Sequence, residues 1–213
     1  MAKKQADYGN ESITMLKGAD KVRKRPGVIF GSDGLDGCEH SVFEVISNSI
    51  DEARAGFGDH IIVTRYQDQT IEVQDFGRGC PVDYNNTEKR YNWELVYCEL
   101  YAGGKYDAEG DTYAYSLGLN GLGLCATQFA SEFMDVEIFR DGFRYNLHFE
   151  HGNNVGGLKK EPTTQKKNRY PDPVEAGSGC IHGYPDPGRV FPRYSPAAGN
   201  RQSEPAVYLP EPE

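Results

Sequence analysis

Apolar residues recur along this chain with two periods, one typical of helices and one typical of strands. The firmest helical pattern covers residues 38–55 (CEHSVFEVISNSIDEARA), where apolar side chains return every three or four residues until Gly56. Weaker helical patterns cover residues 13–25, 92–101 and 121–131. We expect the first of these to end at the Pro-Gly pair that follows it, because proline breaks a helix interior.

The extended patterns come in two pairs. Residues 60–66 and 70–75 flank a short polar turn, and residues 133–140 and 143–149 flank an Asp-Gly turn, which is a strong hairpin signal. The strands gather in hairpins and do not alternate strictly with helices. The sequence therefore predicts an α+β fold in two layers, with helices on one face of a mixed, mainly antiparallel sheet.

The pattern fades towards the C-terminus, where ten of the twelve prolines lie from Pro162 onward. Proline removes a backbone donor and interrupts both helices and ladders. We predict one weak strand at residues 180–184. The chain then divides into an arm at residues 1–12, an α+β domain at 13–191 and a proline-rich, disordered tail at 192–213.

Composition and charge narrow the function classes. The formal net charge is -9, so strong DNA binding by this chain is not expected. The dense basic cluster KVRKR near the N-terminus is interpreted as a solvated surface. The five cysteines form no CxxC pair, which favours reduced thiols without zinc or disulfides. Neither a signal peptide nor a membrane span is apparent, so we expect a cytoplasmic protein without a membrane partner.

The helix predicted at residues 38–55 collects polar groups on one side. At about 100° per residue, one arc is predicted to be the core face: Val42, Phe43, Val45, Ile46, Ile50 and Ala53. The opposite arc holds Glu44, Asn48, Asp51 and Glu52. No lysine or arginine shares this stripe, so nothing is expected to neutralise its carboxylates. Such oxygen ligands suit Mg²⁺ with substrate phosphates, and a carboxylate one turn away can polarise water. An ordinary solvated helix face is the alternative.

Two glycine-bearing segments add candidate ligand contacts. Asp75 ends a predicted strand just before Gly77 and Gly79, where its carboxylate can accept from the exocyclic amine of a purine. A simple turn aspartate is the alternative. The segment SLGLNGLGLCATQ (116–128) places three glycines before a helix, where backbone amides and the helix dipole favour phosphate. Lys105 can supply a cation to phosphate, with a plain surface lysine as the alternative.

The order of these elements resembles the GHKL ATPases, which include DNA gyrase B subunits, Hsp90 chaperones, sensor histidine kinases and MutL. Five blocks are similar to successive blocks of the ATPase domain of type IIA topoisomerase B subunits: LKGADKVRKRPG, VFEVISNSIDEA, VQDFGRGCP, LYAGGKY and SLGLNGLG. The resemblance covers roughly residues 8–160 and implies the Bergerat fold. It leaves open whether gyrase or topoisomerase IV is the nearer relation.

The resemblance implies roles for individual residues. Glu44 matches the general base for attack on the γ-phosphate, Asn48 the Mg²⁺ ligand and Asp75 the adenine-reading aspartate. Tyr8 matches an arm tyrosine that reaches the ATP of a second copy. The implied nucleotide-binding set is Tyr8, Asn48, Asp51, Glu52, Asp75, Gly77, Gly79, Lys105, Tyr113, Gly118, Leu119, Asn120, Gly121, Leu122 and Gly123.

The implied function is Mg²⁺-dependent ATP binding and hydrolysis that drives DNA supercoiling or decatenation in a complete enzyme. The implied partners there are a second copy of the chain, a topoisomerase A subunit and DNA. We expect the chain to end before the transducer domain, which supplies a lysine to the γ-phosphate, so its isolated activity should be low. The alternatives are a non-catalytic nucleotide-binding module or another GHKL branch, such as a chaperone or MutL.

Overall fold

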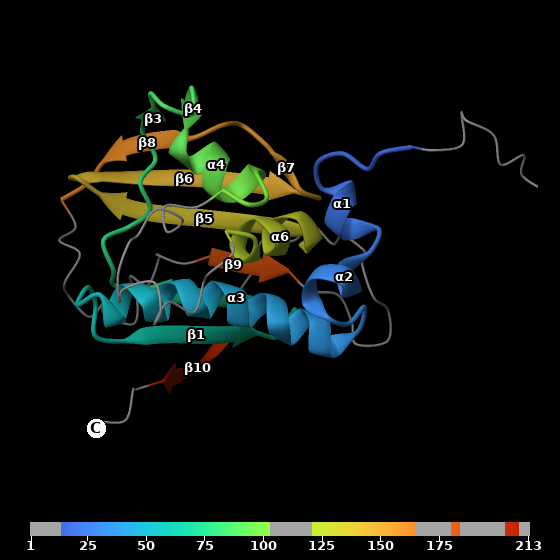
Figure 1. Cartoon of the computed structure of the whole chain (residues 1–213). Helices are drawn as coiled ribbons and strands as arrows, with labels where there is room; N and C mark the ends of the chain where they lie inside the picture. Colours follow the sequence, from blue (N-terminus) through green and yellow to red (C-terminus); the bar gives the residue numbers. More distant parts are fainter. Residues whose placement is uncertain (1–13, 103–120, 165–179, 184–202, 209–213) are drawn as a thin grey trace, which may run out of the picture.

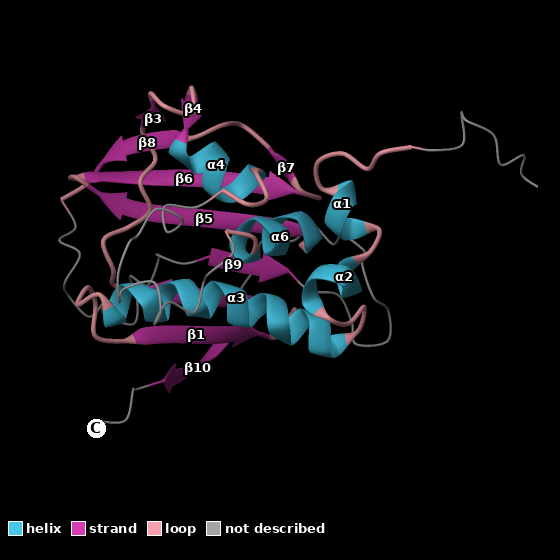
Figure 2. Cartoon of the chain, in the orientation of Figure 1, coloured by secondary structure: helices cyan, strands magenta, loops and turns pink. Residues whose placement is uncertain are grey.

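A computed structural model describes residues 14–102, 121–164, 180–183 and 203–208 (Figure 1). The described residues form two layers, with the helices on one face of a sheet (Figure 2). The helices are α1 (Asp20–Arg23), α2 (Pro26–Phe30), α3 (Leu35–Arg54), α4 (Asn92–Cys98) and α6 (Gly123–Ala130). The α+β class and the helical layer on one face are therefore confirmed.

The main sheet has the strand order β10-β1-β2-β9-β5-β6-β7, with β8 also paired to β6. Its strands are β1 (Ile61–Tyr66), β2 (Thr70–Asp75), β5 (Phe133–Arg140), β6 (Phe143–Glu150), β7 (Asn153–Asn154), β8 (Lys159–Pro162), β9 (Cys180–Gly183) and β10 (Ser203–Tyr208). Every pairing between described strands of this sheet is antiparallel. A small second ladder joins β3 (Tyr84–Asn85) and β4 (Arg90–Tyr91).

The β5–β6 hairpin supplies the centre of the core. Its turn residues Asp141 and Gly142 have φ of 53° and 79°, the left-handed values that a two-residue hairpin turn favours. Alternate side chains of both strands are buried towards the helices, as a strand with one covered face requires. Met134 and Phe149 are 0% exposed and pack with Tyr97 of α4. The predicted hairpin is thus confirmed.

Two predictions near the helices are wrong. The helix expected at residues 13–25 is only four residues long, as α1; it ends before Pro26 as expected, and Pro26 begins a second helix, α2, where its missing N–H costs nothing. Phe43, expected on the core face of α3, is 51% exposed. The buried positions of α3 are mostly small: Gly37, Ser41, Val45, Ser47 and Ser49. Small side chains let neighbouring backbone come close: a Cβ on Gly37 would overlap the carbonyl oxygen of Ser32.

The C-terminal segments also differ in part from expectation. The weak strand predicted at residues 180–184 is present as β9, and it lies between β2 and β5 in the middle of the sheet. Residues 203–208, placed in the disordered tail by the sequence, form the edge strand β10 beside β1. An edge strand tolerates Pro205, because only one of its sides needs ladder donors. None of the described helices is long and apolar enough to span a membrane.

Candidate functional site

Helix α3 connects the two regions in which the sequence predicted ligand contacts. One region is the turn after β2, with Asp75 and Gly77. The other is the N-terminus of α6 at Gly123. Side chains from α3 contact both, so three segments that are distant in the sequence come together around one helix.

The Asp75 carboxylate is held by one donor on each oxygen. Ser49 Oγ donates to Asp75 Oδ2 at 3.0 Å, and the Gly77 N–H donates to Asp75 Oδ1 at 2.9 Å. Ser49 is buried, whereas Asp75 is exposed at the end of β2. Each oxygen keeps a further lone pair, so the fixed carboxylate can accept a hydrogen bond from a ligand.

Glu52 packs on the same turn. A Cβ on Gly77 would lie 2.9 Å from Glu52 Cβ, so only glycine fits there without a shift. Arg78 donates to both Glu52 oxygens, from Nη2 to Oε1 at 2.8 Å and from Nε to Oε2 at 3.0 Å. This bond raises the pKa of Arg78. The Arg78 guanidinium also lies 4.0 Å from the centre of the Phe57 ring.

Glu44 lies at the other end of the site, beside α6. A Cβ on Gly123 would be 2.7 Å from Glu44 Cδ and nearer still to Oε2, so the carboxylate occupies the space that a larger residue would need. The first N–H groups of a helix have no intrahelical acceptor and carry its positive dipole end. The His40 ring nitrogen Nε2 is 3.1 Å from Glu44 Oε1. Glu44 thus lies between an imidazole and the amide end of α6.

The expectation that nothing neutralises the acidic stripe of α3 is wrong. Arg78 pairs with Glu52 from outside the helix, and His40 approaches Glu44 from the preceding turn. The sequence pattern of α3 could not reveal Arg78, because this residue comes from the loop after β2 and not from the helix itself. His40 precedes Glu44 by four residues, and this helical spacing was an available signal. Ser49 was also missed, because a serine on a helix carries no distinctive pattern.

Asn48 fits a magnesium ligand. Its Nδ2 donates to the Glu44 carbonyl oxygen at 2.9 Å, which leaves the side-chain oxygen without a protein donor among the described residues. Mg²⁺ takes oxygen ligands and keeps several waters and substrate phosphates. No group of three His, Cys, Asp or Glu side chains within the described ranges could hold a metal.

The remaining predicted residues are placed as follows. Asp51 is half-buried on α3. Gly79 has φ of 76° and its carbonyl accepts from Arg140 at 2.8 Å, while Gly121 has φ of 58° just before α6. Both φ values favour glycine. Leu122 precedes α6 as its N-cap. Six predicted residues lie outside the described residues: Tyr8, Lys105, Tyr113, Gly118, Leu119 and Asn120.

Two partly buried cysteines, Cys80 and Cys98, are poorly suited to nucleophilic chemistry. Desolvation of the thiol raises the pKa of Cys80 to about 12, so the protonated form persists at neutral pH. Burial likewise raises the pKa of Cys98 to about 11.

Comparisons with known proteins give a consistent result. No model of a known protein family matches the chain. The chain is 43% identical to the B subunit of DNA gyrase from Treponema denticola over 162 residues, which are 76% of this chain and 25% of that protein. It is 42% identical to the B subunit of DNA topoisomerase 4 from Bacillus subtilis over 177 residues, 81% of this chain and 27% of that protein.

A solved structure is also similar. The topoisomerase IV ATP-binding domain of Francisella tularensis, in complex with a small-molecule inhibitor, matches with a TM-score of 0.60 and 33% sequence identity. The match covers 84% of this chain and 43% of that one. The chain spans about a quarter of the length of the curated relatives that it matches.

Proposed function

Because this chain belongs to the family of the gyrase and topoisomerase IV B subunits and has the fold of their ATP-binding domain, we propose that it binds ATP with Mg²⁺ and hydrolyses it. Membership in this family replaces the alternatives of a chaperone or a MutL protein. The observation that carries the proposal is the position of α3. Its side chains touch Asp75 through Ser49 and Gly123 through Glu44.

At one end of α3 the proposed ligand is the adenine base. Asp75 accepts a hydrogen bond from the exocyclic amine, because Ser49 and the Gly77 N–H fix its carboxylate while lone pairs remain. Gly77 and Gly79 let the turn approach the base. Glu52 and Asp51 line the same side of the helix, and Arg78 holds Glu52 in place.

At the other end the proposed ligand is the triphosphate. Backbone N–H groups at Gly121, Leu122 and Gly123 bind phosphate oxygens with the positive end of the α6 dipole. Glu44 takes a proton from water as the water oxygen bonds to the γ-phosphorus and the bond to the β-phosphate oxygen breaks. The products are ADP and inorganic phosphate, and the His40 ring orients Glu44 for this role.

Asn48 is the proposed protein ligand of Mg²⁺, through its side-chain oxygen. The bound ion would neutralise charge on the phosphate oxygens. Several further contacts remain proposals for residues outside the described ranges. Lys105, Tyr113, Gly118, Leu119 and Asn120, which precede α6 in the sequence, would contact the nucleotide. Tyr8 would reach the nucleotide of a second copy.

The wider role is also a proposal. We infer that this ATPase unit belongs to a DNA topoisomerase in which ATP binding closes a dimer, and that the A subunit and DNA act in the complete enzyme. The four cysteines whose side chains the structure describes are free thiols, which supports a cytoplasmic location. The assignment of residues 1–12 as an arm and 13–191 as the ATP-binding domain belongs to the same proposal.

Isothermal titration of the chain with a non-hydrolysable ATP analogue, with and without Mg²⁺, tests binding, and a phosphate-release assay tests turnover. Glu44→Gln should keep its affinity for the analogue and lose turnover. Glu39→Gln is the matched control, since Glu39 is exposed on the same helix. Unchanged turnover in Glu44→Gln would remove Glu44 as the base. Binding without turnover in the unaltered chain would instead favour a non-catalytic nucleotide module, and no binding would refute the proposal.

A further inference from the structure

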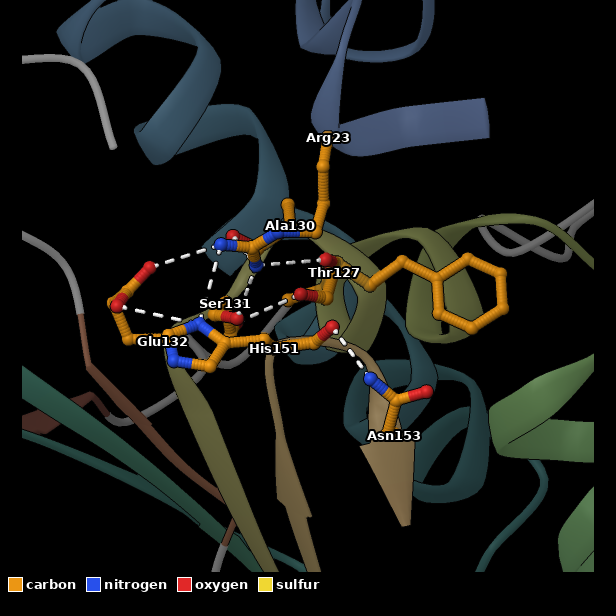
Figure 3. Close-up of polar contacts among 8 residues, drawn as sticks. Arg23, Thr127, Ala130, Ser131, Glu132, His151 and Asn153 are labelled. Atoms are coloured by element: carbon orange, nitrogen blue, oxygen red, sulfur yellow. Dashed lines mark hydrogen bonds and ion pairs between the residues drawn. The ribbon is translucent and has the colours of Figure 1, made fainter. Parts of the chain in front are cut away.

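Arg23 lies at the C-terminal end of α6 (Figure 3). Glu44 lies at the other end of this helix, beside Gly123. Its Nη1 donates to the carbonyl oxygens of Phe129, Ala130 and Ser131 at 3.2, 3.3 and 2.8 Å. The last carbonyls of a helix lack intrahelical donors, and a cation there also complements the negative end of the dipole. Arg23 of α1 therefore closes the end of a helix more than a hundred residues away.

The Arg23 side chain is itself held in place. Its Nη2 donates to Glu132 Oε1 at 3.1 Å, and the two side chains are only 18% and 11% exposed. His151 Nδ1 lies 3.3 Å from Nη2 of Arg23 and 3.4 Å from Oε2 of Glu132. A shielded pair keeps more of its attraction than a surface pair. The interpretation of the N-terminal basic cluster as solvated is therefore wrong for Arg23.

A second tether fixes the side of α6. Thr127 Oγ1 donates to the Ser41 carbonyl oxygen of α3 at 3.0 Å, in the buried interior. Ser41 precedes Glu44 by three residues, within one turn of the helix. Helix α6 has eight residues and is therefore roughly 12 Å long, a short rod whose two ends move together. The position of Gly123 beside Glu44 thus depends on both contacts, that of Arg23 at the C-terminus of α6 and that of Thr127 at its side.

We propose that Arg23 is a positioning residue for the phosphate end of the nucleotide site. It acts through α6, by setting the distance between the amides at Gly121–Gly123 and the Glu44 carboxylate. Arg23 contacts neither Glu44 nor Asp75, so its loss should leave the adenine end intact. This inference rests on the proposed function.

The test compares ligands that share adenine but differ in phosphate. Binding of adenosine, ADP and a non-hydrolysable ATP analogue is measured for Arg23→Gln, Arg23→Lys and the control Lys24→Gln. Lys24 is an exposed neighbour paired with Asp20. Arg23→Gln should weaken the affinity for the ATP analogue at least fivefold and change the affinity for adenosine by no more than twofold. The affinity of Arg23→Lys for the ATP analogue should lie between those of Arg23→Gln and the unaltered chain, because an ammonium keeps the charge but not the planar arrangement of donors.

The outcomes separate this inference from its premise. If the unaltered chain binds no nucleotide, the proposed function fails. If it binds ATP but the Arg23 variants lose adenosine and ATP affinity equally, or lose neither, Arg23 has only a general structural role or none. Should Arg23→Gln fail to fold, Arg23→Lys and Glu132→Gln carry the test. Glu132→Gln removes the charge that holds Arg23, and it should also weaken the ATP analogue selectively.

Discussion

The carboxylate of Glu44 fills the space beside Gly123 that any Cβ would need. A methyl carbon placed on Gly123 would lie 2.7 Å from Cδ and 2.8 Å from Cβ of Glu44. Glycine at this position is therefore a condition for bringing the acidic side of α3 against the N-terminus of α6. The proposed hydrolysis depends on this approach, because it places the base beside the phosphate-binding amides.

Gly123→Ala should reduce ATP turnover at least tenfold, because the added methyl displaces Glu44. Helix propensity alone favours alanine over glycine by about 1 kcal/mol, so the thermal midpoint need not fall. Gly34→Ala is the control, since its Cβ would meet only Ser32 Oγ at 3.6 Å. Turnover and circular-dichroism melting measured side by side check this. Full turnover in Gly123→Ala would show that the close approach is dispensable.

Ser49→Ala should weaken nucleotide binding about fivefold, which corresponds to roughly 1 kcal/mol for one lost hydrogen bond. The reason is that Ser49 Oγ orients the Asp75 carboxylate. Ser47→Ala is matched, because Ser47 is buried on the same helix but donates only to the Phe43 carbonyl of its own helix. Titration calorimetry compares the two. If Ser49→Ala and Ser47→Ala bound the nucleotide equally well, the bond from Ser49 to Asp75 would not contribute to ligand binding.

Phe149→Ala should destabilise the fold by about 3–5 kcal/mol, because it empties a site that is 0% exposed in the core of the β5–β6 hairpin. Phe43→Ala should change the free energy of unfolding by only about 0.5 kcal/mol, since Phe43 is 51% exposed. Urea unfolding of both variants measures the difference. A large loss of stability in Phe43→Ala would show that Phe43 belongs to the buried face of α3.

Stability should fall as the pH rises above about 6.5, the ordinary pKa of histidine, because of His148. Burial alone would lower the pKa of His148, but hydrogen bonds to Asp135 and Glu150 and their charges raise it. A raised pKa in the fold adds stability that is complete below the unfolded value and is lost as pH rises through the folded value. His148→Gln should remove this part of the pH dependence of the thermal midpoint. An unchanged pH profile in His148→Gln would contradict the assignment.

Local patterns sufficed for much of the fold. The alternation in residues 133–149 and the Asp141-Gly142 turn predicted the central hairpin, because period-two burial and left-handed turn residues are local properties. The core face of α3 was harder to predict. A helical wheel ranks hydrophobicity, but which arc is buried depends on the neighbouring elements, and Ser47 and Ser49 are buried while Phe43 is not.

The candidate site divides in the same way. The sequence by itself determined the residue types, the hairpin and the family resemblance, since each follows from order and spacing along the chain. Only the tertiary structure decided that Ser49 bonds Asp75, that Arg78 neutralises Glu52, and that Arg23 closes α6. These contacts join positions far apart in the sequence. Their existence depends on how helices and sheet pack, which no local pattern encodes.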